Sequence, residues 1–285
     1  MKPLSRLLPK SMRSDATTIP VVRLQGAIMA NSSPMRQNLS LAATAGVLQK
    51  AFSDKKAPAV AISINSPGGS PVQSRLIFKR IRDIAEEKKK HVHVFVEDVA
   101  ASGGYMIALA GDEIIADPSS IVGSIGVVSA GFGFPELLKK IGVERRVHTA
   151  GQNKAVLDPF QPEKAEDVER LKALQLEIHE IFIDMVKQRR GAKLAENDDL
   201  FTGLFWTGHR AKELGLIDGI GDMRGFLKER YGKKTKMKLI SQSRGLFGRR
   251  LGLVSGPDMS ALGASLATGV MESAEEQALW QRFGL

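Results

Sequence analysis

Three short loops in this sequence combine serine with glycine in a way that could support attack on a carbonyl group. They are residues 65–70 (NSPGGS), 100–105 (AASGGY) and 123–126 (GSIG), and each follows a segment with the pattern of a β-strand. Gly68 and Gly69 have no Cβ to shield their N–H groups, so they can expose these groups at unusual φ and ψ angles. A serine hydroxyl beside such groups would supply a nucleophile and part of an oxyanion hole.

Ser102 is the best candidate for the nucleophile because it stands where a strand is expected to turn into a helix. Its hydroxyl would be exposed at a sharp corner, and the Gly103 N–H, at the positive end of that helix, would point to the same place. Taken singly, each motif also has a structural interpretation, since Gly-Gly is often a turn and a serine before it is often a helix N-cap. Phosphate binding is the weaker interpretation, because Gly-Lys-Ser/Thr does not occur and these loops lack Gly-x-Gly-x-x-Gly.

A serine hydroxyl needs a base to become a good nucleophile, and no histidine follows Ser102 until His148. The five histidines are His91, His93, His148, His179 and His209. The alternative base is a lysine, which is almost fully charged at neutral pH unless it is desolvated. Lys154 is the best candidate, because its neighbours in residues 155–157 are apolar whereas most other lysines lie in charged clusters.

Elements that would position these loops alternate between strand and helix through residues 60–150, which predicts parallel strands joined by helical crossovers. Strands are predicted at 19–30 (two, with a glycine turn), 60–64, 91–100, 112–118, 121–130 and 143–150. Helices are predicted at 39–53, 70–90, 101–112, 134–142 and 162–190, followed by a short strand and a helix capped near Thr207. The carboxyl ends of such strands are where ligands usually bind.

Composition narrows the classes of function further. With 43% hydrophobic and 25% charged residues the chain can bury a sizeable core, and without cysteine it has no disulfide, thiolate metal site or cysteine nucleophile.

Much of the +10 net charge lies in residues 1–13 and 231–254, so no nucleic-acid groove is expected. These segments would contact anionic lipid or a neighbouring subunit, or stay solvated. No signal peptide or membrane-spanning run is found, so a cytoplasmic location is expected, with possible peripheral contact at the inner membrane face.

Four motifs in a fixed order resemble the signal peptide peptidase A (protease IV) family of serine peptidases over roughly residues 19–235. They are NSPGGS, DVAASGGYMIALAGDEIIADPSSIVGSIGVV, GQNKAVLDPF and WTGHRAKELGLIDGIG. The resemblance implies a single α/β domain of the Clp protease/crotonase type, built from repeated ββα units. We expect a basic N-terminal arm at 1–18, the peptidase domain at 19–240, and a basic and then amphipathic C-terminal extension at 241–285.

The resemblance also implies roles for individual residues. Ser102 matches the family nucleophile, Lys154 its general base and Gly69 an oxyanion donor, with Gly103 expected as the second donor. Ser124 matches a serine thought to orient the lysine. No cofactor and no metal are expected. The substrates would be unfolded or membrane-derived peptides such as signal peptides, and the chain would form a homo-oligomeric ring in which serine and lysine come from different copies.

This sequence departs from the family pattern in two respects, and three other functions remain open. No N-terminal membrane anchor is evident, and one copy of the domain is expected where long family members have two. A crotonase-like acyl-CoA enzyme would use the same oxyanion donors without Lys154. A Clp-type Ser-His-Asp peptidase is disfavoured because no histidine closely follows Ser102. A non-catalytic scaffold that binds peptides or membrane is the third alternative.

Overall fold

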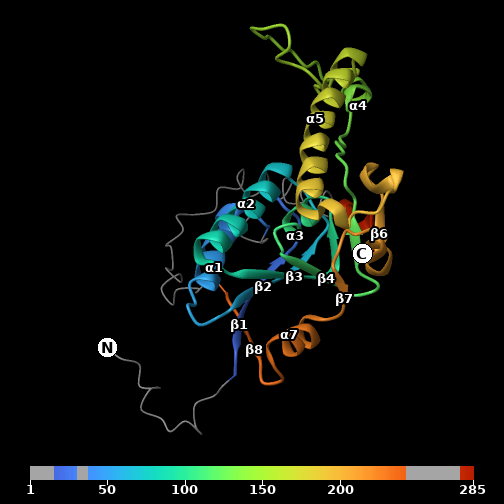
Figure 1. Ribbon diagram of the computed structural model, residues 1–285. Helices are drawn as coiled ribbons and strands as arrows, with labels where there is room; N and C mark the ends of the chain where they lie inside the picture. Colours follow the sequence, from blue (N-terminus) through green and yellow to red (C-terminus); the bar gives the residue numbers. More distant parts are fainter. Residues whose placement is uncertain (1–15, 31–37, 242–276) are drawn as a thin grey trace, which may run out of the picture.

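The computed structural model describes residues 16–30, 38–241 and 277–285, which form a central sheet, flanking helices and a long projection (Figure 1). The strands are β1 (Thr18–Gln25), β2 (Ala59–Ser66), β3 (His91–Ala101), β4 (Glu113–Ala116), β5 (Ile121–Gly123), β6 (Phe205–Thr207), β7 (Gly219–Ile220) and β8 (Lys236–Leu239). The α-helices are α1 (Leu41–Phe52), α2 (Pro71–Lys88), α3 (Gly103–Ala108), α4 (Pro135–Lys140), α5 (Ala165–Arg190), α6 (Gly208–Glu213) and α7 (Met223–Tyr231). Two 3-10 helices cover Gly191–Lys193 and Asp198–Phe201.

The described strands form one sheet in the order β6-β5-β3-β2-β1-β8, with β4 beside β3 and β7 beside β4. Every pair is parallel except β5 with β6. Strand β3 is long enough to pair with β4 along its first half and with β5 along its last residues. The predicted α/β class and the predicted parallel strands with helical crossovers are confirmed.

Helices cover both faces of the sheet, so its central strands are buried on both sides (Figure 1). All eight residues of β2 are buried, as expected for a parallel strand in the middle of a sheet. On one face, α1, α2 and α3 supply Leu48, Ile77 and Tyr105 to the main core. On the other face, α7 packs Leu227 into a smaller cluster with residues of β1, β2, β3 and β4. Each fully buried aliphatic side chain contributes about 1.5–3 kcal/mol.

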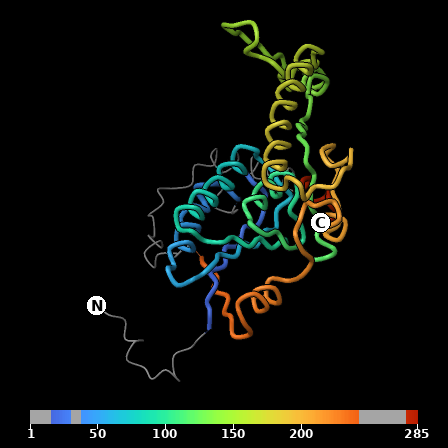
Figure 2. The backbone as a smooth tube through the Cα atoms, viewed as in Figure 1, coloured from blue at the N-terminus to red at the C-terminus, as the bar shows by residue number. Residues whose placement is uncertain are grey.

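Helix α5 extends from the body of the protein and carries the projection (Figures 1 and 2). Its 26 residues span about 39 Å, and buried Phe182, Met185 and Val186 fix its C-terminal half to the core. Residues 127–164 run out along the N-terminal half of the helix and back, with α4 near the outer end. The predicted helix over 162–190 is confirmed from Ala165 onward, because Lys164 has an extended backbone.

Two predicted strands differ from the structure. The strand predicted over 143–150 is wrong, because this segment lies in the projection with no strand beside it among the described residues. Its two valines, Val143 and Val147, are 50% and 37% exposed and lie beside no strand of the described ranges. The strand predicted over 121–130 ends at Gly123, because Ser124 adopts a φ of 53° and the chain leaves the sheet.

The basic tails stay predictions, because residues 1–15 and 242–276 lie outside the described ranges. The sheet itself begins at β1 and ends at β8, which pair in parallel, so the first and last strands of the described core are neighbours. None of the helices in the described ranges is both long and apolar enough to cross a lipid bilayer.

Candidate active site

The three serine- and glycine-containing loops meet at one edge of the sheet because they follow neighbouring parallel strands. Strand β3 lies between β2 and β5, with Ser66 beside Ala100 and Ala101 beside Gly123. The loops after these strands therefore leave the sheet at the same level. A hydrogen bond from the Ser102 N–H to the Gly123 carbonyl oxygen (2.8 Å) joins two of them directly.

Ser102 lies at the corner between β3 and α3 in a conformation that serine rarely adopts. Its φ is 50° and its ψ is −121°, a backbone geometry that costs of order 1–3 kcal/mol and is concentrated at functional sites. The residue occupies the N-cap position of α3, yet its side chain makes no capping hydrogen bond. The residue is half-buried and its hydroxyl makes no hydrogen bond within the described ranges, which argues against a purely structural role as helix cap.

Gly69 and Gly103 lie against each other beside Ser102, and a side chain at either position would force neighbouring atoms to move. A Cβ on Gly69, whose φ is 136°, would lie 2.2 Å from the Ile28 carbonyl oxygen. A Cβ on Gly103 would lie 2.4 Å from Ser74 Oγ and 3.4 Å from the Gly69 nitrogen. Neither the Gly69 N–H nor the Gly103 N–H has an acceptor among the described residues. Both groups are therefore available to a negatively charged oxygen near Ser102.

Ile28 fixes the glycine loop from the other side. Its N–H donates to the Gly68 carbonyl oxygen (2.8 Å), and its own carbonyl oxygen accepts from the Ser70 N–H (2.7 Å). These two bonds hold the loop on both sides of Gly69, so the orientation of the Gly69 N–H is set by the strand-like pairing with residue 28. A donor held in place in this way does not have to reorient when negative charge develops on an oxygen bound beside Ser102.

Ser102 opens into a cavity of about 270 Å³ that several segments of the chain build together. Its lining includes Ser102, Ser124, Gly126, Val127, Val128, His179, Thr202, Gly203 and Arg282. Ser124 is buried, has a φ of 53°, and its N–H donates to the Leu204 carbonyl oxygen (2.8 Å). The structure thus brings Ser102, Gly69, Gly103 and Ser124 together at one site.

His179 also lines this cavity, and sequence reasoning missed it. It lies on α5, and its Nε2 is 3.0 Å from the Ile125 carbonyl oxygen, directly after Ser124. The separation of 77 residues from Ser102 carries no spacing signal, because the approach depends on how α5 packs against α3. Only the position of His179 on the inner side of a long helix could have suggested contact with the core.

Lys154 lies apart from the other site residues predicted from the sequence. It is exposed, it belongs to the turns of 152–157 in the projection, and it is absent from the lining of the Ser102 cavity. The segment around residue 150 forms the outer end of the projection, away from α3 (Figures 1 and 2). Within one chain, therefore, Lys154 stays in contact with water, whereas a lysine that acts as a base has to be desolvated.

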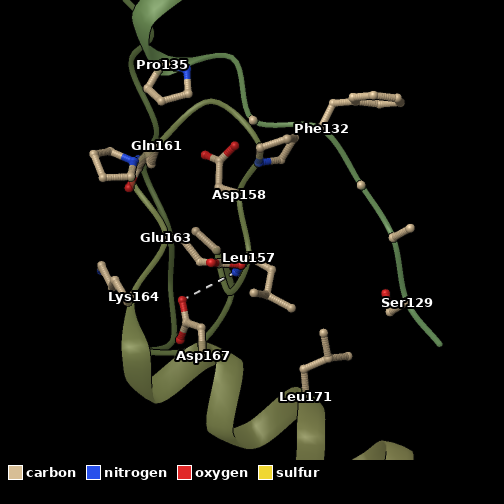
Figure 3. A pocket seen from close by; sticks show the side chains of 16 residues that line it. Ser129, Phe132, Pro135, Leu157, Asp158, Gln161, Glu163, Lys164, Asp167 and Leu171 are labelled. Atoms are coloured by element: carbon tan, nitrogen blue, oxygen red, sulfur yellow. Dashed lines mark hydrogen bonds between the residues drawn. The ribbon is translucent and has the colours of Figure 1, made fainter. Parts of the chain in front are cut away.

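The segment carrying Lys154 is nevertheless held firmly on α5. Arg170 donates to Asn153 Oδ1 (2.9 Å), and the Leu157 N–H donates to Asp167 Oδ2 (3.3 Å). A cavity of about 560 Å³ lies beside it, between α5 and the returning chain, with Phe132, Leu157, Asp158 and Leu171 among its lining (Figure 3). Asp158, 4% exposed, pairs with Arg145 at 2.7 Å. These contacts present Lys154 outward from a defined surface.

The C-terminal residues of the chain pack next to the site. Phe283 is buried against Val99 and Ala101 near the end of β3, and its ring lies 5.0 Å from that of Phe205. Arg282, the preceding residue, lines the Ser102 cavity. The end of the chain therefore forms part of the wall of the candidate active site.

Comparisons with known proteins agree with this geometry. Residues 84–236, which are 153 of the 285 residues, match the family described as peptidase family S49. "Serine protease SPPA, chloroplastic" of Arabidopsis thaliana is 34% identical over 212 residues, covering 72% of this chain and 31% of that protein. "Protease 4" of Haemophilus influenzae is 34% identical over 207 residues, covering 71% of this chain and 32% of that protein.

A further relative carries a different name. "Na(+)/H(+) antiporter NhaA" of Brucella abortus is 69% identical over 286 residues, which cover 99% of this chain but 39% of that protein. This chain thus spans less than half the length of each of these relatives. The antiporter name describes the whole of a longer protein, whereas the family match covers more than half of this chain. The chain therefore belongs to peptidase family S49, and the resemblance to signal peptide peptidase A noted in its motifs is confirmed.

Proposed function

We propose that this chain is a serine endopeptidase in which Ser102 is the nucleophile. The observation that carries the proposal is the strained Ser102, with its unused hydroxyl, beside the free N–H groups of Gly69 and Gly103. Ser102 Oγ would attack the scissile carbonyl carbon, and the two N–H groups would bind the resulting oxyanion. Removing one such donor typically costs about 10²–10³-fold in kcat. The C–N bond then breaks, and water hydrolyses the acyl-enzyme.

Lys154 from a neighbouring copy would serve as the general base. It would accept the proton of Ser102 Oγ and later protonate the leaving amine, which returns it to the neutral form. The exposed position of Lys154 on a well-anchored projection supports delivery to another chain. Burial in the Ser102 cavity, beside Ser124, would desolvate the amine there, and only a closed ring gives every serine a partner lysine.

The substrates we propose are unfolded or membrane-derived peptides, including signal peptides. Support comes from the family, whose named members include the serine protease SPPA. An extended peptide would lie across the loops after β2 and β5, where Gly69 and Ser124 flank Ser102. No cofactor takes part in the proposed reaction. Contact with an anionic membrane depends on the basic tails and remains a prediction.

A mixing experiment tests both the chemistry and the shared site. Ser102→Ala and Lys154→Ala should each reduce hydrolysis of a chromogenic peptide by about 10³-fold or more, because nucleophile and base act as a unit. The two inactive proteins, unfolded and refolded together, should regain part of the activity. Lys140→Ala, which removes an exposed lysine of α4, is the matched control and should stay active.

Three outcomes would contradict parts of the proposal. No recovery in oligomers proven to be mixed would place serine and base in the same chain. Acyl-CoA turnover that survives Ser102→Ala would favour the crotonase-like alternative. Failure of a fluorophosphonate probe to label Ser102 in the assembled wild-type protein, together with absent hydrolysis, would favour a non-catalytic scaffold.

His179 is the second candidate for the base, because it lines the Ser102 cavity within one chain. If it accepts the proton, His179→Gln should abolish hydrolysis and Lys154→Ala should retain it. The glutamine amide can still donate to the Ile125 carbonyl oxygen, so the loop contact made by His179 Nε2 is preserved. We expect the opposite result, in which Lys154→Ala is the more damaging substitution.

A further inference from the structure

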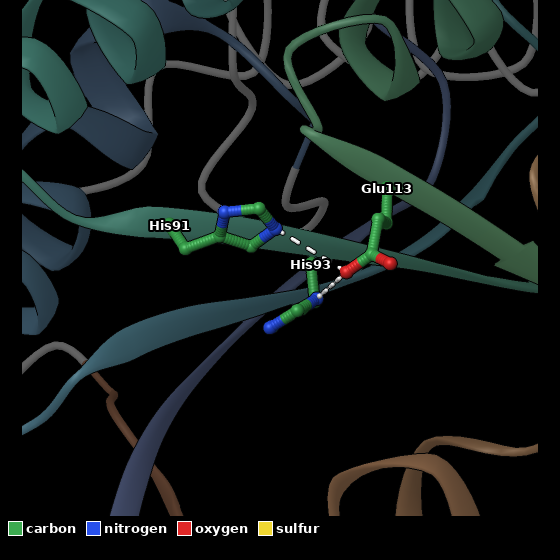
Figure 4. Close-up of side chains that lie close together, drawn as sticks. All are labelled: His91, His93 and Glu113. Atoms are coloured by element: carbon green, nitrogen blue, oxygen red, sulfur yellow. Dashed lines mark hydrogen bonds and ion pairs between the residues drawn. The ribbon is translucent and has the colours of Figure 1, made fainter. Parts of the chain in front are cut away.

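A cluster of two histidines and a glutamate lies at the opposite end of β3 from Ser102 (Figure 4). His91 and His93 are the first and third residues of β3, and Glu113, the first residue of β4, pairs with His93 in the sheet. One carboxylate oxygen, Glu113 Oε2, lies 3.2 Å from His91 Nε2 and 3.1 Å from His93 Nδ1. The three ligand-type atoms all lie within 4.8 Å of one another.

Two of these three separations match the spacing around a bound metal ion. Tetrahedral Zn²⁺ with bonds of about 2.0–2.1 Å holds its ligand atoms about 3.3 Å apart. The two nitrogen-to-oxygen distances in the cluster are close to that value without any movement of the chain. Two imidazoles and one carboxylate are a donor set that zinc uses in proteins, with a fourth position left to water.

The outer nitrogens of the two imidazoles also lie near oxygen atoms. His93 Nε2 lies 2.7 Å from the Tyr231 hydroxyl oxygen, within hydrogen-bond distance, whereas His91 Nδ1 lies 3.6 Å from Asp112 Oδ2, which is too long for a direct hydrogen bond. A histidine that binds metal through one nitrogen typically donates the N–H of the other to an oxygen, which fixes the tautomer and the ring orientation. The contact with Tyr231 therefore holds the His93 ring with its inner nitrogen facing Glu113.

His93 supplies an independent sign of a missing ligand. Its side chain is completely buried, and its Nδ1 makes no hydrogen bond of acceptable geometry with any group in the described ranges. The nitrogen lies 3.1 Å from Glu113 Oε2, yet the two atoms form no hydrogen bond of acceptable geometry. A buried nitrogen without a hydrogen-bond partner is costly, and an ion shared with Glu113 Oε2 would supply the missing partner.

We propose that His91, His93 and Glu113 form a binding site for a divalent transition metal of the zinc type. The ion would link β3 to β4 and, through the hydroxyl of Tyr231, to the end of α7. The guanidinium of Arg230, 3.7 Å from the same carboxylate oxygen and 55% exposed, would turn toward solvent when the ion binds. Because β3 has 11 residues, the site lies about 30 Å from Ser102 and would stabilise the fold without taking part in peptide hydrolysis.

Metal binding can be measured directly on the full chain after treatment with a chelator and removal of any affinity tag. We expect the protein to retain roughly one Zn²⁺ per chain after gel filtration and to unfold at a higher temperature with Zn²⁺. With Co²⁺ in its place, visible absorption bands of a four-coordinate site should appear. Glu113→Gln and His91→Asn should each lose the retained metal, the thermal shift and these bands.

His209→Asn is the matched control, because His209 faces Glu213 on the surface helix α6 without a third ligand. It should retain the metal like the wild-type protein. Tyr231→Phe keeps the ring and removes the hydroxyl, so it should weaken Zn²⁺ binding about 10-fold or more while the protein stays folded. Absence of retained metal in the wild-type protein, equal retention in Glu113→Gln, or equal loss in His209→Asn would overturn the proposal.

Discussion

At the scale of single residues, the candidate site depends on a backbone conformation that the local sequence does not favour. Ser102 is held at a positive φ by the Ser102 N–H bond to Gly123, by the parallel pairing of β3 with β5, and by the close packing of Gly68 behind its Cβ. A strained conformation of this kind persists only where several contacts of the surrounding structure enforce it. The same corner places Ser102 beside Gly103 and the glycine loop that contains Gly69.

A comparison of two inactive variants should reveal this strain. Ser102→Gly and Ser102→Ala both remove the hydroxyl, but only glycine adopts a φ of 50° without a steric penalty. We expect the glycine variant to be more stable than the alanine variant by about 1 kcal/mol in urea unfolding. Equal stability of the two variants would show that Ser102 is not strained. The comparison needs no activity, so it is independent of the proposed mechanism.

At the scale of elements, the C-terminal end of α5 is the anchor on which both the projection and His179 depend. Arg190 is 3% exposed, donates to the Gly215 carbonyl oxygen and pairs with Asp218 at 2.8 Å. Arg189 donates to the carbonyl oxygens of Leu109 and Gly111, at the end of α3. These bonds fix the base of a long helix whose outer half has few contacts with the body of the protein.

Loss of the Asp218 charge should therefore destabilise the protein in a pH-dependent way. Burial opposes ionisation of Asp218, but hydrogen bonds from Arg190 and Lys193 outweigh it and hold the pKa of the carboxyl below its ordinary value. Because the folded-state pKa is depressed, the stabilisation is present above the unfolded-state pKa of about 3.9 and is lost as pH falls through the folded-state pKa. At neutral pH, Asp218→Asn should cost about 3 kcal/mol, since it leaves Arg190 buried without its charge partner.

Urea midpoints of the wild-type and Asp218→Asn proteins, measured at pH 7 and in acid near pH 3, test this expectation. The difference between them should be large at pH 7 and should begin to shrink once the pH falls below about 3.9, where the unfolded wild-type carboxyl takes up a proton while the folded one still resists it. A difference that stays constant across this range would mean that the charge of Asp218 does not contribute to stability. Asp83→Asn is a control, because Asp83 pairs with Lys79 on the exposed side of α2 and should change stability little.

At the scale of the whole molecule, the projection carries several large apolar side chains that are exposed in one chain. Along the segment that runs out to its end, Phe132, Leu137 and Ile141 are 74%, 51% and 60% exposed. On the N-terminal half of α5, Leu174 and Leu176 are 57% and 61% exposed. Exposed apolar side chains gathered in one part of a protein often mark an interface. Covering it with a second copy would also bring Lys154 close to another chain.

Charges placed on this surface should therefore prevent assembly and abolish activity together. Phe132→Glu and Ile141→Glu are expected to yield smaller species in analytical ultracentrifugation and to lose peptide hydrolysis in parallel. Both side chains are exposed in a single chain, so each substitution should change the free energy of unfolding of that chain by less than about 0.5 kcal/mol. Leu239→Glu, a 61% exposed position on the edge strand β8, is the matched control and should leave assembly intact. Full activity from a monomeric Phe132→Glu protein would contradict a shared site.

Local sequence patterns were enough to predict the class of fold and most of its elements. The apolar run of β2, the amphipathic pattern of α2 and the glycine turns each act within about ten to twenty residues, where neighbours along the chain dominate. For the same reason the loops containing Gly69, Ser102 and Ser124 could be expected at one edge of a parallel sheet. The resemblance to a peptidase family rests on those same loops.

Other features depended on contacts between distant segments, which no local pattern encodes. The segment 143–150 does not form the predicted strand, because pairing requires a neighbouring strand and this segment has none among the described residues. His179 reaches the Ser102 cavity only through the packing of α5, and Glu113 joins His91 and His93 only through the pairing of β3 with β4. Lys154 was predicted as the general base because its neighbours along the chain are apolar. Its side chain is nevertheless exposed, because α5 carries this segment away from the body of the protein. The sequence by itself thus determined which groups could react, and the tertiary structure decided which of them meet within one chain.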